Sequence, residues 1–178
     1  MYFCRYKTPC GFDDIVMESD GDFLLGLRFE NKGNKKPVGE NIDCESLEIF
    51  KQTCKWLDTY FSGEEPNFAL KYKFICGTDF QNRVWRILEQ IPFGKTVCYG
   101  DIAKEISKQS KNGKMSAQAV GGAVKANPIC IVVPCHRVVG KGGELVGYAG
   151  GIENKKQLLI LEKVRRIDFE SAKKKMKQ

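Results

Sequence analysis

Residues 127–140 have the sequence NPICIVVPCHRVVG, and this stretch is the most informative in the chain. Its Asn-Pro pair ends the preceding helix, because the residue before a proline is disfavoured in the helical region. The apolar run 129–133 then predicts a short buried strand or extended segment that stops at Pro134. Next come Cys135, one of eight cysteines, and His136, the single histidine of the 178 residues. We therefore take Cys135 as the first candidate for a reactive residue.

A cysteine beside a histidine is a candidate nucleophile with its base. The ordinary thiol pKa is about 8.5, so nucleophilic work at neutral pH needs a base or a positive field nearby. His136 and Arg137 offer both. On a strand, however, neighbouring side chains point to opposite faces. Direct contact between Cys135 and His136 therefore requires a turn, which Pro134 favours, or a bridging water.

Four helices are predicted in the second half of the chain, from apolar residues at three- and four-residue intervals. They cover residues 80–91, 102–106, 117–126 and 153–166. Thr78 and Gln81 form a capping box before the first helix, and Ser116 can cap the third. The second and third helices, joined by the polar and basic loop 108–114, resemble a helix-turn-helix arrangement.

Gly121 and Gly122 lie inside the third of these helices and require an explanation. Each costs about 1 kcal/mol relative to alanine in a helix interior. Close approach of another backbone, such as a nucleic-acid strand, is one explanation. Tight packing on a neighbouring helix is another, and the sequence leaves both open.

The first 76 residues predict a small α/β unit. Alternating apolar residues indicate two strands around an Asp20-Gly21 turn, which is a hairpin signal. Apolar residues from Leu47 to Phe61 recur at helical spacing, and residues 68–75 predict a further strand. We find no catalytic pattern in this part of the chain.

Charge is distributed unevenly. Residues 1–76 carry 10 Lys/Arg and 13 Asp/Glu, a net charge of −3, whereas residues 77–178 carry 19 and 9, a net charge of +10. A basic half suggests a polyanionic partner. A solvated lysine-rich surface with a basic tail explains the same numbers, so charge alone leaves both interpretations open.

Composition excludes several classes of protein. Hydrophobic residues at 42% and charged residues at 29% are typical of an ordinary globular chain. The longest apolar run is too short to span a bilayer, and the N-terminus MYFCRYKTPC lacks the apolar core of a signal peptide. We expect a cytoplasmic protein, or a nuclear one if the source is eukaryotic, with reduced cysteines. A single histidine excludes zinc sites with two Cys and two His, and we expect no metal.

The flanks of the Cys-His pair form a longer pattern. In chain order its parts are Tyr99, Ala119-Val120-Gly121-Gly122-Ala123, Asn127-Pro128, residues 133–140 and Gly147-Tyr148-Ala149-Gly150-Gly151. Together they closely resemble the O6-alkylguanine-DNA alkyltransferases, also called methylated-DNA–protein-cysteine methyltransferases. The resemblance is specific over residues 78–165 and weak over 1–76.

The resemblance implies an α/β (α+β) protein with two domains and a tail. Residues 1–76 would form a ribonuclease-H-like α/β scaffold with an antiparallel sheet. Residues 77–170 would form a mainly helical alkyl-acceptor domain with a winged helix-turn-helix-like DNA-binding unit, followed by a basic tail at 171–178. The implied partner is double-stranded DNA containing O6-alkylguanine, and the protein is expected to be a monomer without a cofactor or a membrane association.

The implied activity is direct-reversal DNA repair, by irreversible and stoichiometric transfer of an alkyl group from a flipped-out base to Cys135. O4-alkylthymine stays open as a second substrate. His136 resembles the family's base, acting through a water, and Glu162 the carboxylate that orients it. Asn127 matches the residue that braces the active-site turn, and Tyr99 the tyrosine that donates a hydrogen bond to the departing base.

The resemblance also implies residues that surround the base and the DNA. The substrate-binding positions are Pro134, Val138, Tyr148, Ala149 and Gly150. The DNA-binding positions on the helix expected to enter the minor groove are Ala117, Gln118, Gly121, Gly122 and Ala123, and Arg137 is a further expected DNA contact. Lys95, Lys114 and Lys125 are candidate phosphate contacts on charge and placement. Lys104 and Lys111 are further phosphate candidates on charge and placement. Gln118 stands where some family members have an arginine, and its neutral amide brings no charge.

Two other functions stay open at this stage. One is a DNA-binding protein that senses alkylation damage without transfer, although relatives of that kind lack the acceptor cysteine. The other is a thiol hydrolase that uses Cys135, His136 and Glu162. The strong charge difference between the two parts of the chain counts against a hydrolase.

Overall fold

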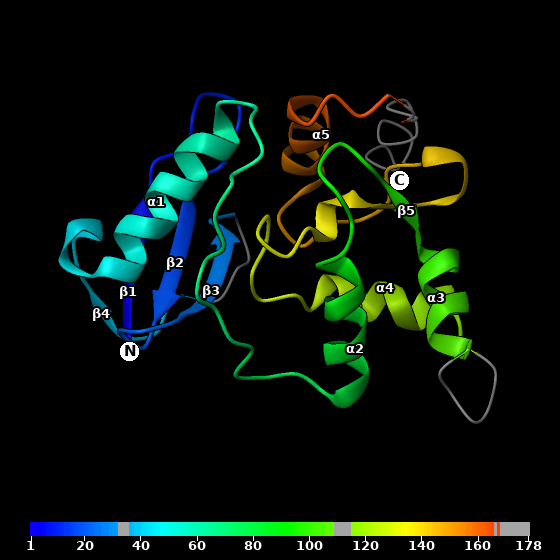
Figure 1. The fold of residues 1–178 in the computed structure, drawn as a ribbon, viewed down its shortest axis with the longest axis horizontal. Coiled ribbons are helices and arrows are strands. Elements are labelled where there is room, and N and C mark those ends of the chain that lie inside the picture. The colour runs from blue at the N-terminus through cyan, green and yellow to red at the C-terminus, as the bar shows by residue number, and fades with distance from the viewer. Residues whose placement is uncertain (32–35, 109–114, 166, 168–178) are drawn as a thin grey trace. The chain divides into compact units, whose positions relative to one another are not determined.

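The computed structural model describes residues 1–31, 36–108, 115–165 and 167 (Figure 1). Contacts divide the chain into two compact units, each made of two segments. Unit 1 consists of Met1–Ile75 and Pro128–Cys130, and unit 2 of Cys76–Asn127 and Ile131–Gln178. The described chain contains no helix that is long and apolar enough to cross a membrane.

Unit 1 is built on a four-stranded sheet in the order β3-β2-β1-β4. Its strands are β1 (Tyr2–Tyr6), β2 (Ile15–Ser19), β3 (Leu24–Phe29) and β4 (Glu40–Asn41). β2 pairs antiparallel with both β1 and β3, and only the short β4 is parallel to its neighbour. The predicted hairpin is confirmed, and Asp20 shapes its turn by accepting hydrogen bonds from the backbone of Asp22 and Phe23.

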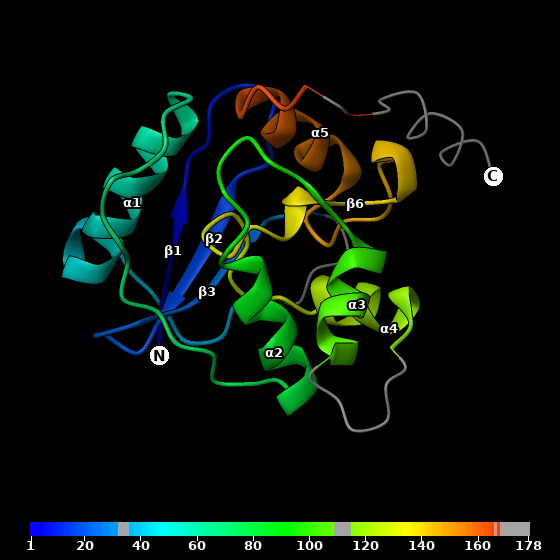
Figure 2. The same ribbon diagram turned by 45° about the vertical axis from the view of Figure 1, so that its right-hand side comes forward.

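Helix α1 (Glu48–Phe61) lies across one face of this sheet (Figures 1 and 2). The predicted amphipathic helix is therefore confirmed. Its buried side chains include Phe50, Leu57 and Tyr60, which are fully enclosed together with the apolar residues of β2 and β3. A short 3-10 helix, η1 (Cys44–Ser46), precedes it and is capped by the side chain of Asp43.

Two features of unit 1 differ from the sequence prediction. Residues 68–75 do not form a strand, but make a single bridge in which Tyr72 lies opposite Leu24. Burial does alternate along this segment, with Leu70 buried and Phe68, Tyr72 and Phe74 partly buried, but the bridge at Tyr72 does not extend into a ladder. β1 was not predicted, because its sequence YFCRY is too short to show a pattern of its own.

The segment Pro128–Cys130 belongs to unit 1 although its neighbours in sequence belong to unit 2. The backbone N–H of Leu27 donates to the carbonyl of Pro128 at 2.9 Å, and the N–H of Cys130 donates to the carbonyl of Leu27 at 2.7 Å. The predicted extended segment thus exists, but it turns at once, since Ile131 has a φ of 68°. A β-branched residue in this left-handed region carries a strain of about 1–3 kcal/mol.

Unit 2 contains three helices that pack together (Figure 2). They are α2 (Asp79–Leu88), α3 (Tyr99–Lys108) and α4 (Ala117–Lys125), close to the predicted ranges. The predicted capping box of Thr78 and Gln81 is present, and Ser116 caps α4 through the backbone N–H of Ala119. The indole of the buried Trp85 donates to the carbonyl of Ala123 at 2.9 Å, which ties α2 to α4.

Short elements complete unit 2. β5 (Val97–Cys98) pairs in parallel with β6 (Val138–Val139), and the 3-10 helices η2 (Cys135–Arg137) and η3 (Lys141–Gly143) flank β6. The last helix, α5 (Ile152–Leu161), is shorter than the predicted 153–166. It ends because Glu162 caps it and Lys163 has a φ of 55°. The predicted tail 171–178 and most of the loop 108–114 lie outside the described residues.

Trp85→Phe should destabilise the protein by about 1–3 kcal/mol, because it leaves a buried carbonyl without its indole donor and removes buried apolar volume. The matched control is Trp56→Phe on α1, where the side chain is only partly buried and the loss should stay near 0.5 kcal/mol. Urea unfolding followed by circular dichroism measures both values. Equal losses would contradict the role of Trp85.

Candidate active site

The Cys-His pair lies on a turn, not on a strand. Cys135, His136 and Arg137 form η2, and Cys135 and His136 are 2% and 0% exposed. Successive side chains of a 3-10 helix diverge by about 120°. The side chains of Cys135 and His136 therefore do not point to opposite faces, as they would on a strand. Both lie in one buried region, where each has its own partner.

Asn127 holds both the backbone and the sulfur of this turn. Its side-chain Nδ2 donates to the carbonyl of Val133 at 2.8 Å and to Cys135 Sγ at 3.0 Å. A hydrogen bond to a sulfur stabilises the thiolate more than the neutral thiol. The predicted bracing position of Asn127 therefore also has a chemical effect on Cys135.

Glu162 is the centre of a buried ionic cluster. Its Oε1 lies 2.7 Å from His136 Nε2, and Arg137 donates to both carboxylate oxygens at 3.0–3.2 Å. The backbone N–H of Gly94 donates to Oε2 at 3.1 Å. Arg137 is held from its other side by the carbonyl of Ile91 at 2.6 Å. The carboxylate thus fixes the imidazole through one nitrogen.

The cluster determines the charge of its members. Burial alone would raise the pKa of Glu162, but the hydrogen bonds and charges of His136 and Arg137 outweigh it and lower the pKa to about 2. Burial lowers the pKa of His136, and Glu162 only partly offsets this. At neutral pH the pair is therefore an ionised carboxylate with a neutral imidazole, which is the form that accepts a proton.

The placement of Arg137 corrects one expectation. We predicted it among the DNA contacts, but it is only 8% exposed, and its guanidinium is occupied by Glu162 and by the carbonyl of Ile91. A buried carboxylate requires a compensating cation. Arg137 supplies that charge inside unit 2.

Lys155 is a residue of this region that sequence reasoning missed. It is 0% exposed, and its Nζ donates to the carbonyls of Val138 at 2.6 Å and Val146 at 3.1 Å. Burial lowers its pKa to about 8, and negative charge on Cys135 acts in the opposite direction. A signal was present, because Lys155 lies on the same helical face of α5 as the buried Leu158 and Leu159.

A cavity of about 940 Å³ opens within unit 2. The residues that line it and matter here are Cys98, Tyr99, Lys104, Ala117, Gln118, Gly121, Lys125 and Tyr148. The half-buried Tyr99 has a pKa raised to about 12, first by burial and then by Cys135, so its hydroxyl keeps its proton at neutral pH. The cavity is of a size that encloses a small organic ligand.

The substrate positions predicted from the resemblance fall into two groups. Tyr148 lines the cavity. Pro134, Val138, Ala149 and Gly150 are not among the described residues that line it; Val138 gives its carbonyl to Lys155, and Gly150 gives its carbonyl to the side chain of Asn154. Cys135 is buried and is likewise not among the described lining residues.

The small residues of α4 divide between two faces. Ala117, Gln118 and Gly122 are exposed, and a Cβ added at Gly122 would meet no described atom within 4 Å. A Cβ at Gly121 would meet only the ring of Tyr99, at 3.8 Å. Tight helix packing therefore does not explain the two glycines. The other explanation, close approach of a backbone from outside the protein, remains.

Ala123 corrects a second expectation, since we predicted it among the DNA contacts. It is 3% exposed, on the face of α4 that packs inward, and its carbonyl accepts from Trp85. A helix turns by 100° per residue, so a run of small residues cannot stay on one face. Only part of the run can therefore meet a partner.

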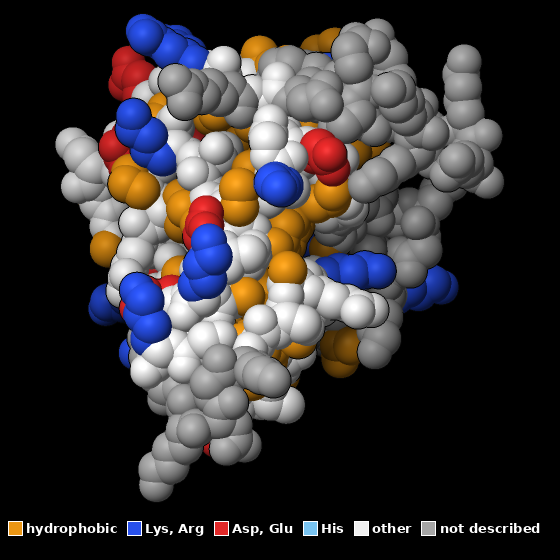
Figure 3. Space-filling model, turned by 90° about the vertical axis from the view of Figure 1, so that its right-hand side faces the viewer, with side chains coloured by type: hydrophobic (Ala, Val, Ile, Leu, Met, Phe, Trp, Pro, Cys, Tyr) orange, Lys and Arg blue, Asp and Glu red, His pale blue; other side chains and the backbone are white. Residues whose placement is uncertain are grey.

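Three of the lysines predicted as phosphate contacts lie among the described residues of unit 2. Lys95, Lys104 and Lys125 are exposed, and the last two line the cavity. Figure 3 views the side of Figure 1 where α3 lies, and it shows apolar side chains through the middle of the face with Lys and Arg side chains beside and around them. Lys111 and Lys114 lie outside the described residues. Within the described ranges no group of three or more His, Cys, Asp or Glu side chains is arranged to hold a metal ion.

Comparison with known proteins gives consistent matches. The family model described as 6-O-methylguanine DNA methyltransferase, DNA binding domain, matches residues 79–164. A methylated-DNA–protein-cysteine methyltransferase of Methanosarcina acetivorans is 42% identical over 164 residues, which cover 91% of this chain and 98% of the relative. One of the same name from Haemophilus influenzae is 36% identical and covers 94% and 89%.

Solved structures agree in fold. Mycobacterium tuberculosis OGT in complex with DNA aligns with a TM-score of 0.77 at 37% identity and covers 94% of this chain and 96% of that one. An O6-methylguanine DNA methyltransferase of Methanococcus jannaschii aligns with a TM-score of 0.62 at 29% identity and covers 93% and 96%. The predicted mixed α/β fold is confirmed by these matches.

Glu162→Gln should lower the free energy of unfolding at pH 7 by about 3 kcal/mol. The pKa of Glu162 lies near 2 in the folded protein against an ordinary 4.5, so its contribution is present above pH 4.5 and is lost as the pH falls towards 2. Urea unfolding at several pH values measures this. The matched control is Glu153→Gln, an exposed residue of α5, which should change little. A Glu162→Gln curve that keeps the acid dependence of the unaltered protein would contradict the assignment.

Proposed function

We propose, from the premise that the chain belongs to the methylated-DNA–protein-cysteine methyltransferase family, that Cys135 is its acceptor residue. The protein repairs DNA by direct reversal: it transfers an alkyl group from a DNA base to its own cysteine. One observation selects Cys135 among the eight thiols. The single histidine directly follows it in sequence, and this histidine lies 2.7 Å from the carboxylate of Glu162.

The transfer is a single displacement. The Cys135 thiolate attacks the saturated carbon attached to O6 of guanine, a sulfur–carbon bond forms, and the carbon–oxygen bond breaks. The electron pair stays with the base, which departs as an anion that needs a proton or a hydrogen bond. The thioether product is not readily cleaved by water, so each protein molecule reacts once.

His136 removes the thiol proton in this proposal. Its Nε2 is engaged by Glu162, so the proton reaches Nδ1, through a water. The lowered pKa of His136 keeps the imidazole neutral and able to accept. Glu162 then stabilises the imidazolium that forms, Arg137 keeps Glu162 ionised, and Asn127 stabilises the sulfur anion through its 3.0 Å hydrogen bond.

Tyr99 acts on the leaving group. Because the pKa of its hydroxyl is raised to about 12, the group stays protonated and can donate to the departing base. Tyr99 lines the cavity together with Tyr148, which fits a flipped-out base between aromatic and small side chains. O6-alkylguanine is the proposed substrate, and O4-alkylthymine stays a second candidate.

Double-stranded DNA is the partner, and we propose that α4 enters its minor groove. The exposed Ala117 and Gly122 and the partly exposed Gly121 permit close approach, and Gln118, which lines the cavity, would hydrogen-bond the orphaned partner base. A base inside a stacked duplex is out of reach of a buried thiol, so flipping is required. We further propose that the protein acts as a monomer, with residues 1–76 as scaffold and 77–170 as the DNA-binding and acceptor domain.

Mixing the protein with duplex DNA that contains O6-methylguanine should add one methyl group, mapped to Cys135 by peptide mass spectrometry. Cys135→Ala should still bind this DNA but accept no methyl group. The matched control is Cys98→Ala, because Cys98 is a partly exposed thiol that lines the cavity. Transfer that survives in Cys135→Ala would overturn the assignment, and tight lesion binding without transfer by the unaltered protein would favour a damage sensor.

Lys104→Ala with Lys125→Ala should weaken DNA binding and reduce its salt dependence. Each phosphate contact contributes about 0.9 to the slope of log affinity against log salt, so the double variant should lose about 1.8. Lys51→Ala with Lys55→Ala on α1 removes the same charge from unit 1 and serves as control. Fluorescence anisotropy at several salt concentrations measures the slopes, and equal slopes for both double variants would contradict this DNA surface.

A further inference from the structure

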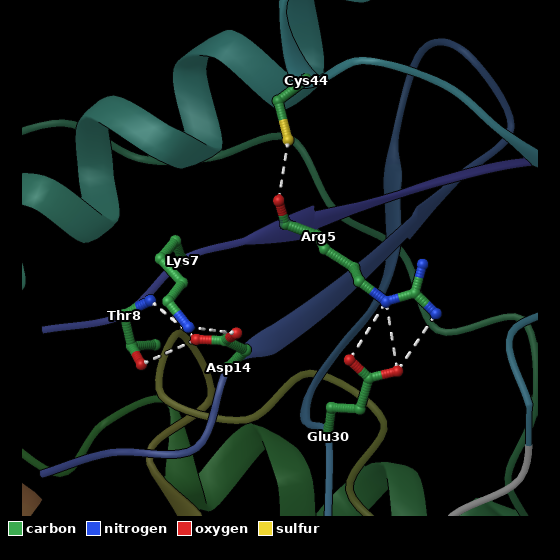
Figure 4. Close-up of polar contacts among 6 residues, drawn as sticks. All are labelled: Arg5, Lys7, Thr8, Asp14, Glu30 and Cys44. Atoms are coloured by element: carbon green, nitrogen blue, oxygen red, sulfur yellow. Dashed lines mark hydrogen bonds and ion pairs between the residues drawn. The ribbon is translucent and has the colours of Figure 1, made fainter. Parts of the chain in front are cut away.

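Three cysteines of unit 1 come from three different elements and lie together. Cys4 is on β1, Cys44 on η1 and Cys54 on α1. The Sγ atoms of Cys4 and Cys44 are 2.7 Å apart, although 40 residues separate them in sequence. Figure 4 shows Cys44 extending from η1 towards β1, where its Sγ also lies 3.4 Å from the carbonyl oxygen of Arg5.

This distance is unusual for two thiols. The S–S bond of a disulfide is about 2.05 Å long, so the two sulfurs need to approach by well under 1 Å to form one. Cys10 and Cys76 are exposed elsewhere and make no comparable contact among the described residues. The pairing of Cys4 with Cys44 is therefore specific and is not a consequence of a cysteine-rich sequence.

The two sulfurs differ in access. Cys4 is 1% exposed, whereas Cys44 is partly exposed. A small oxidant in solution therefore reaches Cys44, and the buried Cys4 is already in place to attack the oxidised sulfur. Cys54 is a third neighbour, but the 2.7 Å approach to Cys44 is made by Cys4, so Cys4 is the thiol placed for that second attack.

Metal binding does not account for the cluster. No set of three or more His, Cys, Asp or Glu side chains in the described ranges is arranged to hold a metal, and this includes the three cysteines. Burial and the neighbouring Cys44 both raise the pKa of Cys4. The pair is therefore stable as neutral thiols until an oxidant acts on it.

We propose that Cys4 and Cys44 form a reversible intramolecular disulfide when the protein meets a hydroperoxide. Cys44 attacks one oxygen of hydrogen peroxide, the O–O bond breaks, and a sulfenic acid and one water are produced. Cys4 then attacks this sulfur, the S–O bond breaks, and a second water leaves. The two thiols lose two electrons and two protons in total, and one peroxide is reduced to two waters.

The bond has a structural consequence for unit 1. It closes a loop that contains β2, β3 and β4, the remaining strands of the sheet. A cross-link over a loop of this length restricts the unfolded chain and raises the stability of the folded unit. The site is separate from Cys135 and does not depend on the alkyl-transfer proposal.

The test begins with the unaltered full-length protein treated with hydrogen peroxide, then alkylated and digested with trypsin without reduction. Trypsin separates the three thiols, because Arg5 follows Cys4 and Lys51 lies between Cys44 and Cys54. We expect a linked Cys4–Cys44 peptide pair that dithiothreitol resolves, and a melting temperature about 5–15 °C higher before reduction.

Variants define the pair. Cys44→Ser should lose both the linked peptides and the rise in melting temperature, whereas Cys10→Ser, at an exposed position of the same unit, and Cys54→Ser should keep both. A Cys44–Cys54 link, or Cys4 and Cys44 that stay alkylated while other thiols oxidise, would overturn the proposal. The peptide map of the unaltered protein decides this even if Cys44→Ser fails to fold.

Discussion

The active site depends on one buried carboxylate. Glu162 is 3% exposed, and an ion in such a place persists only if cations and donors surround it. Arg137, His136 and the backbone of Gly94 meet this requirement. The same contacts that stabilise the carboxylate therefore also fix the imidazole beside Cys135, so fold stability and chemistry rely on the same hydrogen bonds.

Helix α5 brings two opposite charges into the interior of unit 2. Lys155 and Glu162 are seven residues apart and lie on one face of the helix with Leu158 between them. Lys155 is satisfied by two carbonyls, and Glu162 by Arg137 and His136. Neither ion pairs directly with the other, so each keeps its own charge close to the reactive turn. Because both charged groups are buried and held by fixed partners, the electrostatic field that they create at the sulfur of Cys135 is also fixed.

Much of this could be predicted from sequence, because the signals are local. The capping box at Thr78, the hairpin turn at Asp20 and the Cys-His pair depend on residues close together in the chain. The burial of Arg137 could not be predicted in this way, and for Lys155 the one local signal was the helical face that it shares with Leu158 and Leu159. A lysine or arginine is exposed by default, and only partners from distant segments reverse this default. The left-handed Ile131 is a similar case, since its conformation is imposed by its surroundings.

The strand-like segment Pro128–Cys130 has a further consequence for how the protein can be divided. It pairs with Leu27 of unit 1, yet Asn127 before it and Ile131 after it belong to unit 2. A cut near residue 76 would therefore not release two complete modules, because the N-terminal fragment would expose an unpaired sheet edge along β3. Such an edge invites association with other chains. The two units are consequently expected to be inherited, expressed and purified as one piece, and exchange of either unit between relatives would have to carry these three residues with it.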